Sequence, residues 1–573
     1  MGADFGVRWH DTAFARARHV SQIQSTVVPA QSKAQSKQSG CRCVGDSFKV
    51  VTHRQRMNNN TPAIIRSLII YAMIIPLAIW MGFMLANPFD RGTFNYAGIF
   101  FLILLAPIML RWHHLLLIVS WNLGMTIFFL PGSPPIWLLM VALSLGLSVL
   151  HRTINDKVKF LSAPSISWPL LFFLTVVLFT AKLTGGIGLN SLGGDTAGGR
   201  SYIMLIFGIL GYFALIAQPI PTQKVGLYVG LFFLSGCAAF IGDLVPFVPH
   251  QMYFIFALFP TYGSDMGLME QGNINYVARY SGTGWMGEAL YFFMLARYGP
   301  RGIFLGGRLW RPVIFAVSFI LMFFGGFRSL IILGGVIFVI QFFLERMYQT
   351  RAFPVFLFSG LIAFTLLIAF ASKLPFSVQR SLTFVPLLQI DPRARLDAEA
   401  SQEWRLQIWK DALPTVPKYL LLGKGYAISK SELAVASNQA FQYAGNFEQV
   451  EISGNYHSGP LSVVIYFGIW GVVALLWFWI ASLRALWFNY HYGDPALRTV
   501  NIFLLSYFIA RILLFLVIFG GLYSDMFYFT SVMGLSVSLN GGIRRPVRAT
   551  ARVVDKASDV PLARPRFQPF YPR

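Results

Sequence analysis

Two arginines and a histidine stand out because each lies where an apolar part of the chain meets a polar part. Arg328 follows an apolar run, Arg405 lies in a long hydrophilic stretch, and His457 comes just before another apolar run. Arginine binds phosphate oxygens through a planar fork and stays charged. Histidine can accept a proton near neutral pH. The set is therefore suited to holding a phosphate group and taking a proton from an attacking hydroxyl.

Each of these residues also has a plain structural interpretation. Arg328 could be an arginine at a membrane edge whose charged head reaches the interface, although a charge within an apolar run is costly and favours a function. Arg405 could be a solvated charge on a surface helix, as Arg393 and Arg395 could. His457 could be an ordinary interfacial histidine.

Composition places the chain in a membrane. Hydrophobic residues make up 55% of the chain, charged residues only 12%, and the mean hydropathy is +0.59. A soluble chain of this size needs far more charge to cover its surface. The formal net charge is +23, and much of it lies in the tails and in short loops between apolar runs. That placement is typical of the cytoplasmic side of a membrane, so we expect no nucleic acid as partner.

Fourteen apolar runs fit or approach the length of a membrane helix, which is about 20 residues. Several are short, so we predict an all-α polytopic membrane protein with 12 to 14 spans. The expected spans are 65–86, 95–110, 113–130, 136–150, 166–181, 201–218, 225–244, 285–297, 312–325, 329–344, 353–371, 459–482, 499–519 and 524–539.

The apolar runs also organise the chain. The expected parts are a disordered basic tail over 1–60, spans over 61–371, a large external loop over 372–458, the last spans over 459–539 and a basic tail over 540–573. Basic loops stay inside, so both termini are expected in the cytoplasm and the large loop outside. Met57, just before the first apolar run, is an alternative start of the chain.

The large loop must position Arg405. Trp404, Ile408 and Ala412 recur every four residues and predict an amphipathic helix over 401–413. We expect its apolar stripe to lie on the outer leaflet, with Arg405 aimed along the surface.

The sequence contains no motif for a metal or a cofactor. It has no HExxH motif, and the expected outer loops carry no clustered carboxylates. The cysteines, Cys41, Cys43 and Cys237, show neither zinc spacing nor a disulfide framework. The glycine-rich turn at 423–425 is too short to indicate a phosphate loop.

The order of these motifs resembles the O-antigen ligase and O-antigen polymerase superfamily of bacterial envelope glycosyltransferases. The resemblance covers roughly residues 270–540, and Ser458 after His457 and Phe327 and Ser329 beside Arg328 depart from the commoner family pattern. It rests on Arg279-Tyr280-Ser281-Gly282-Thr283-Gly284, Gly326-Phe327-Arg328-Ser329, Arg405-x-x-x-Trp409, the stretch 417–426 beginning at Pro417, and His457 before Tyr466-Phe467-Gly468-Ile469-Trp470-Gly471.

The resemblance implies the multi-span glycosyltransferase fold called GT-C and a glycan carried on undecaprenyl diphosphate. It implies metal-independent chemistry on the outer face of a bacterial inner membrane. Arg328, Arg405 and Arg279 are then the expected diphosphate-binding residues, and His457 with Arg405 and Arg328 the expected catalytic set. The acceptor stays open: a lipid A core makes a ligase, a second lipid-linked repeat a polymerase, and a protein hydroxyl a protein-glycosylating enzyme.

A transporter or flippase for polysaccharide or lipid-linked glycan is the alternative from another class. Paired charges inside the membrane and broken helices in two matching halves would favour it. The sequence shows no matching halves, and a flippase has no need of so large a loop.

Overall fold

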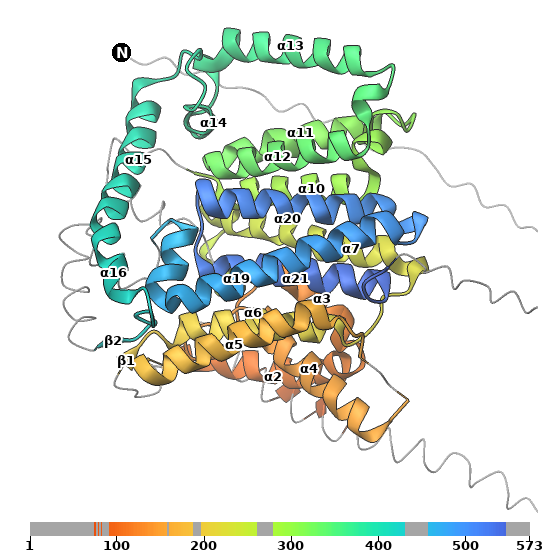
Figure 1. Cartoon of the computed structure of the whole chain (residues 1–573), viewed down its shortest axis with the longest axis vertical. Helices are drawn as coiled ribbons and strands as arrows, with labels where there is room; N and C mark the ends of the chain where they lie inside the picture. The colour runs from red at the N-terminus through yellow and green to blue at the C-terminus, as the bar shows by residue number, and fades with distance from the viewer. Residues whose placement is uncertain are drawn as a thin grey trace, which may run out of the picture. The chain divides into compact units, whose positions relative to one another are not determined.

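The structure is a computed structural model, which describes residues 91–157, 160–186, 196–259, 279–429 and 456–545, and also positions 71, 74, 75, 78, 79 and 82. The chain divides into two units, Met1–Trp80 and Met81–Arg573, and all of the labelled helices and strands lie in the second unit. The predicted all-α class is confirmed (Figure 1). The only strands in the described ranges are β1 (Thr196–Ala197) and β2 (Ile428–Ser429), which pair antiparallel.

The α-helices are α2 (Arg91–Arg111), α3 (His113–Trp121), α4 (Ile136–Ile154), α5 (Pro164–Thr184), α6 (Gly199–Ile216), α7 (Val225–Leu234), α8 (Ile255–Leu258), α10 (Ser281–Phe304), α11 (Trp310–Phe324), α12 (Arg328–Leu344), α13 (Phe353–Phe370), α14 (Phe376–Ser381), α15 (Pro392–Ala412), α16 (Val416–Tyr419), α19 (Gly459–Tyr492), α20 (Arg498–Val517) and α21 (Leu522–Asn540). Short 3-10 helices are η2 (Thr222–Lys224), η3 (Ser235–Phe247), η4 (His250–Met252), η5 (Met347–Gln349), η6 (Ala371–Lys373), η7 (Leu413–Thr415) and η8 (Pro495–Leu497).

Six segments in the described part of the chain are long and apolar enough to cross a membrane. They are Ile136–Ile154, Pro164–Thr184, Thr222–Phe247, Phe353–Lys373, Gly459–Tyr492 and Pro495–Val517. Gly98–Arg111 and His113–Trp121 could form a seventh as one bent span, and three further apolar helices are shorter. The predicted total of 12 to 14 spans stays a prediction, and the expected span 65–86 lies almost wholly outside the described residues.

Most expected helix positions lie within a few residues of the observed ones, but the prediction for 113–130 is wrong. Helix α3 ends at Trp121, and the chain turns at Gly124, whose φ of 69° suits glycine. Thr126 then runs extended, and its N–H donates to the Leu258 carbonyl at 2.8 Å. Apolarity alone gave no sign of this turn.

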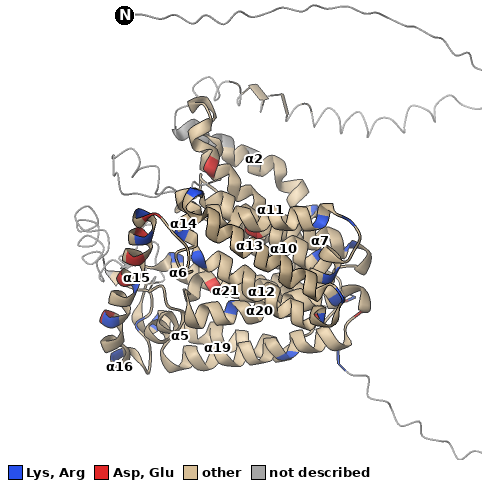
Figure 2. Cartoon of the chain, turned by 90° about the horizontal axis from the view of Figure 1, so that it is seen from above, with Lys and Arg blue, Asp and Glu red and all other residues tan. Residues whose placement is uncertain are grey.

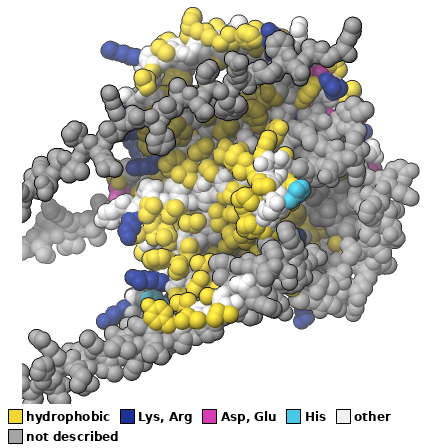
Figure 3. All heavy atoms as spheres, turned by 180° about the vertical axis from the view of Figure 1, so that it is seen from behind, with side chains coloured by type: hydrophobic (Ala, Val, Ile, Leu, Met, Phe, Trp, Pro, Cys, Tyr) yellow, Lys and Arg dark blue, Asp and Glu magenta, His cyan; other side chains and the backbone are white. Residues whose placement is uncertain are grey.

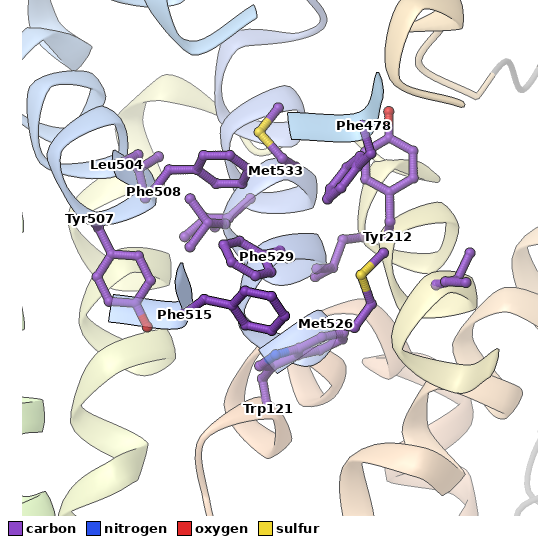
Figure 4. Packing of buried hydrophobic residues seen from close by; sticks show 14 of the residues in the cluster. Trp121, Tyr212, Phe478, Leu504, Tyr507, Phe508, Phe515, Met526, Phe529 and Met533 are labelled. Atoms are coloured by element: carbon purple, nitrogen blue, oxygen red, sulfur yellow. The ribbon is translucent and has the colours of Figure 1, made fainter. Parts of the chain in front are cut away.

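The core lies where α19, α20 and α21 meet α6 and α3 (Figure 4). Aromatic rings fill it in tilted and edge-on pairs, such as Phe508 with Phe529 at 5.3 Å and Trp479 with Phe515 at 5.5 Å. Helices in a membrane associate through close packing, which small residues permit. A Cβ on Gly534 of α21 would lie 2.8 Å from the Leu215 side chain of α6, so this glycine allows the contact.

Helix α19 is broken at Gly468, and the glycine-rich turn fills the break. Gly468 has a φ of 61°, which leaves the carbonyls before it without their helical partners. The Lys424 N–H donates to the Ile465 carbonyl at 2.7 Å, and the Gly425 N–H to the Tyr466 carbonyl at 3.0 Å. The turn at 423–425 therefore has a structural role, because it supplies hydrogen-bond donors to the carbonyls at the break in α19.

Helix α15 runs across one end of the membrane helices, as the left side of Figure 1 shows. Charged residues gather near α15 and at the opposite ends of the helices, with few between (Figure 2). Much of the face seen in Figure 3 is hydrophobic, as a lipid-facing surface requires. Helix α13 has no buried residue and is apolar throughout, which is typical of a span covered by lipid.

Two expectations for the loop helix need correction. Helix α15 begins at Pro392 rather than at 401, because Asp391 caps it by accepting from the Arg393 N–H at 2.9 Å. The apolar stripe packs on protein rather than on the outer leaflet: Ile408 is 2% exposed and Ala412 is fully buried within the main core.

Candidate functional site

The end crossed by α15 brings five distant parts of the chain together. They are the start of α10, the turn between α11 and α12, α14, α15 and the start of α19. Arg279, Arg328, Arg405 and His457, all singled out in the sequence, lie on these segments. Their chemical roles stay predictions, and their contacts show what the arrangement can do.

Arg328 is the first residue of α12 and points toward α15. The turn before it uses Gly326, which has a φ of 67°. The Arg328 Nη2 donates to the Ala398 carbonyl on α15 at 3.1 Å. The half-buried guanidinium therefore reaches a protein group, which a simple interfacial arginine does not need.

Arg279 lies just before α10 and, like Arg328, faces α15. Its guanidinium is 5.9 Å from the centroid of the Phe327 ring, and its Nη2 is 3.7 Å from Asp397 Oδ2. Its Nε is buried and has no hydrogen-bond partner in the described part of the chain.

Arg380 and Asp397 also belong to this group, and the sequence did not single them out. Arg380 of α14 is 5% exposed, and its Nε makes a very short contact with Asp397 Oδ2 of α15. Its Nη1 donates to the Gly326 carbonyl at 2.6 Å. An arginine in a polar loop gives no signal of its own, and its burial depends on where α14 docks.

A small separate core fixes α14 in place. Val378 and Leu382 are buried there against Phe323 and Phe324 at the end of α11. The Ser381 hydroxyl also donates to the Phe323 carbonyl at 2.9 Å. This packing holds Arg380 beside the turn that carries Arg328.

Arg405 is half-buried, and among the described residues it forms no ion pair. Its guanidinium is 5.5 Å from the centroid of the Phe519 ring. Burial lowers the pKa of Arg405, and repulsion from Arg328, Arg380 and Arg279 lowers it further. The Nε is buried and unbonded among the described residues. A cation in this state would be stabilised by an anion.

His457 lies beside Arg405 in a strained backbone conformation. Its φ is 51°, in the left-handed region that few non-glycine residues adopt. Its ring is 5.0 Å from Trp404 and 5.1 Å from Phe519, so His457 and Arg405 share the Phe519 ring. Burial and the Arg405 charge lower the pKa of His457 to about 4. The imidazole is therefore neutral at pH 7.

The Arg-x-x-x-Trp spacing has a structural reason. Arg405 and Trp409 are one turn apart on α15, and the Trp409 Nε1 donates to the Tyr456 carbonyl at 2.9 Å. The tryptophan thus ties α15 to the chain just before His457, while the arginine supplies the charge.

We call Arg279, Arg328, Arg380, Arg405 and Asp397 the outer cluster. It holds four guanidinium groups and one carboxylate within the described residues. The described ranges contain no group of three or more His, Cys, Asp or Glu side chains that could hold a metal ion. An excess of guanidinium groups favours an anionic ligand, and the neutral His457 lies at the edge of the outer cluster.

A second charged group lies deeper, among the membrane helices, and was also missed from the sequence. We call it the inner cluster: Arg511, Glu288, Asp525 and Tyr507. Arg511 Nη2 is 3.6 Å from Glu288 Oε1, its Nη1 is 3.9 Å from Asp525 Oδ1, and its Nε donates to the Tyr507 hydroxyl at 3.0 Å. The charges come from three different helices, so no local pattern in the sequence joins them.

The inner cluster borders a large cavity. The cavity has a volume of about 1540 Å³, and Arg511, Glu288 and Trp285 are among the residues that line it. The Trp285 ring stacks on Phe327 at 6.2 Å, next to the outer cluster. The Asp525 carboxylate also accepts from the Gly521 N–H at 2.8 Å, which steadies the loop that carries Phe519.

Comparison with known protein families adds one finding. A family model described as O-antigen ligase matches residues 313–476, less than a third of the 573-residue chain, and confirms the family predicted from the motifs. The matched stretch includes Arg328, Arg380, Arg405 and His457, while Arg279 lies before it. A search of curated proteins finds no match.

Proposed function

We propose that the protein transfers a glycan from undecaprenyl diphosphate to an acceptor hydroxyl. The premise is that the chain resembles the O-antigen ligase/polymerase superfamily over residues 313–476. The observation that carries the proposal is the meeting of Arg328, Arg405 and a neutral His457 at one end of the membrane helices. The acceptor is a lipid A core, a growing polysaccharide or another envelope glycan.

The outer cluster binds the diphosphate of the donor. Arg405, Arg328 and Arg279 offer planar forks that match phosphate oxygens and that stay charged at all physiological pH. As the bond between the glycan and the diphosphate breaks, negative charge grows on the leaving diphosphate. Arginines held in place beforehand stabilise that charge without having to reorganise.

His457 takes the proton. The acceptor oxygen attacks the anomeric carbon of the donor glycan while its proton passes to the imidazole. The bond from that carbon to the diphosphate oxygen breaks, and undecaprenyl diphosphate leaves with the electron pair. General-base catalysis of this kind contributes about 10²–10⁴-fold.

Donor binding also strengthens the base. The Arg405 charge is one of the two causes that hold the His457 pKa at about 4. A diphosphate bound to Arg405 offsets this charge, so the pKa of His457 rises toward its ordinary value. A histidine with a higher pKa is a better base, and the site therefore becomes competent when the donor is in place.

The proposed chemistry needs no metal ion, because the arginines perform the charge stabilisation that a metal would give. We place the protein in a bacterial inner membrane, with both termini in the cytoplasm and the site on the periplasmic face. The basic tails and short basic loops support this orientation.

The transporter alternative gains no support from the family match. The inner cluster and the breaks in α10 and α19 are features that transporters also show. Protein groups fill both breaks, however: the turn at 423–425 fills the break in α19, and Glu345 accepts from the Arg301 N–H at 2.8 Å beside the break at Gly299.

The test is the envelope glycan profile of a deletion strain carrying wild-type or variant protein at matched levels in the membrane. Arg328→Ala, Arg405→Ala and His457→Ala should each fail as the deletion does. Accumulated full-length lipid-linked chains would identify a ligase, and accumulated single repeats a polymerase. If all three variants restore the normal profile, the proposed site is wrong.

A further inference from the structure

The contact between Arg380 and Asp397 suggests a role that the family match does not assign. Resting on the proposed function, we propose that Asp397 is a built-in anion that occupies the diphosphate position, and that Arg380 beneath it is a further diphosphate-binding residue. Donor binding then requires Asp397 to move aside.

The position of the carboxylate supports this role. Asp397 Oδ2 contacts Arg380 Nε and lies 3.7 Å from Arg279 Nη2, so one oxygen bridges two arginines from different elements. The next residue, Ala398, accepts from Arg328 Nη2 at 3.1 Å. Residues 397 and 398 of α15 therefore cover three of the four guanidinium groups with acceptor oxygens, as the oxygens of a diphosphate would.

Exposure shows which partner can move. The Asp397 side chain is 25% exposed and that of Arg279 is 24% exposed, whereas that of Arg380 is only 5% exposed. Arg380 is held in place by its hydrogen bond to the Gly326 carbonyl and by the small core around α14. The carboxylate is thus the accessible member of a pair whose arginine is held in place.

The charge balance of the outer cluster shows why a diphosphate can replace the Asp397 carboxylate. One carboxylate leaves the outer cluster with an excess of positive charge. Burial lowers the pKa of both Arg405 and Arg380, and repulsion from neighbouring arginines lowers it further. A diphosphate carries more negative charge than one carboxylate and presents more acceptor oxygens, so it compensates more of this excess. After transfer, Asp397 can return to the arginines and help undecaprenyl diphosphate leave.

The competing interpretation is that Asp397 is a fixed support that orients Arg380 and Arg279. The two interpretations predict opposite signs for one measurement. Removing a competitor tightens the binding of diphosphate, whereas removing a support weakens it.

The experiment titrates the purified full-length protein in detergent with inorganic pyrophosphate by calorimetry. Asp397→Asn keeps the shape of the side chain and removes its charge, and it should tighten binding by about tenfold, within the range of ordinary coupling energies. Glu399→Gln is the matched control, since it removes an exposed carboxylate two residues along the same helix, and it should leave the affinity unchanged. Equal or weaker binding by folded Asp397→Asn would overturn the inference.

A second variant guards against misfolding, because Asp397→Asn leaves a buried arginine without its partner. Arg380→Gln combined with Asp397→Asn removes both charges at once. Competition predicts that this double variant still binds pyrophosphate more tightly than wild type, through the freed Arg279, but less tightly than Asp397→Asn. Weaker binding than wild type by both this double variant and the folded Asp397→Asn would instead show that Asp397 is a support.

The same titration separates this inference from the proposed function. If wild type, Asp397→Asn and Arg405→Ala all bind pyrophosphate no better than inorganic phosphate, the proposed diphosphate site itself is wrong. If wild type binds pyrophosphate, Arg405→Ala abolishes binding and Asp397→Asn changes nothing, only the role of Asp397 is wrong.

Discussion

The protein has two arginine-centred clusters that differ in the balance of their charges. In the inner cluster one guanidinium, that of Arg511, has two carboxylates and a tyrosine hydroxyl as partners. Among the described residues of the outer cluster, four guanidinium groups surround one carboxylate, that of Asp397, which pairs with Arg279 and Arg380. Both lie in the same unit, and the inner cluster is the more deeply buried: Arg511 and Asp525 are 9% and 7% exposed, whereas most of the outer cluster is half-buried.

The difference indicates what each cluster is for. A buried charge whose partners are all supplied by the protein is satisfied and needs nothing from outside. A group of like charges that the protein leaves short of partners is stable only with a ligand of the opposite sign. The outer cluster is therefore the binding site that we propose, while Asp525 of the inner cluster accepts from the Gly521 N–H next to the loop that carries Phe519.

The largest expected effect is the loss of product when an unpartnered arginine of the outer cluster is removed. Arg405→Ala should lower glycan transfer by about 10³-fold or more, as loss of an arginine that stabilises a leaving phosphate does elsewhere. The measurement is the envelope glycan profile at matched protein level. Arg395→Ala is the control, because Arg395 is an exposed residue of the same helix; equal losses for both would remove the distinction between the two arginines.

Removal of the base should cost somewhat less. His457→Ala should lower transfer by about 10²-fold or more, the lower part of the range for general-base catalysis, while pyrophosphate binding to the outer cluster stays intact. His491→Ala, at the exposed far end of α19, should have no effect. Loss of pyrophosphate binding in His457→Ala would show that His457 holds the site together and does not act as a base.

The inner cluster should respond in stability and not in chemistry. Arg511→Met leaves Glu288 and Asp525 without a counter-charge, and breaking a buried pair in this way costs about 3–5 kcal/mol. We expect less protein in the membrane and a lower midpoint of thermal unfolding in detergent. Arg484→Met, an exposed residue of α19, is the control.

One result with Arg511→Met would contradict the contrast between the inner and the outer cluster. If Arg511→Met folds as well as wild type and yet abolishes transfer, then the inner cluster contributes directly to substrate binding. The cavity that it borders would then be the place to look for the substrate.

The sequence predicted the outer cluster only in part, for physical reasons. Arg328, Arg405 and His457 each lie at a change from apolar to polar chain, and such changes are visible without a structure. Arg380 lies at no such boundary, and its importance comes from a small core that buries α14 against α11. Asp397 lies before residue 401, where the apolar periodicity predicts the helix to begin.

The helices themselves were easier to predict, because membrane spans are long and apolar. The failures came where the backbone departs from a regular helix, as at Gly124 after α3. The Asp391-Pro392 pair was an overlooked signal, since an aspartate followed by proline is a common helix start. The inner cluster had no signal of this kind, because its charges come from helices far apart in the chain.

The smallest expected effect is a shift in pH dependence, and it tests the coupling between the outer cluster and its base. The pKa of His457 is lowered to about 4, so the imidazole is unprotonated above that pH and loses its role as a base below it. The pH dependence of kcat/KM reports the free enzyme and that of kcat the enzyme with donor bound. We therefore expect the acid limb of kcat/KM near pH 4 and the acid limb of kcat at higher pH, because the diphosphate offsets the Arg405 charge.

The measurement is transfer by purified protein in detergent between about pH 4 and pH 8, with activity at pH 7 re-measured after each exposure to exclude unfolding. Asp397→Asn provides the matched comparison, because a diphosphate that binds more tightly should leave the acid limb of kcat unchanged once the site is saturated. Two acid limbs at the same pH, near the ordinary histidine value of about 6.5, would contradict the coupling. In that case His457 would not sense the positive charge of the outer cluster, and the contrast between excess positive charge in the outer cluster and paired charges in the inner one would have no consequence for the base.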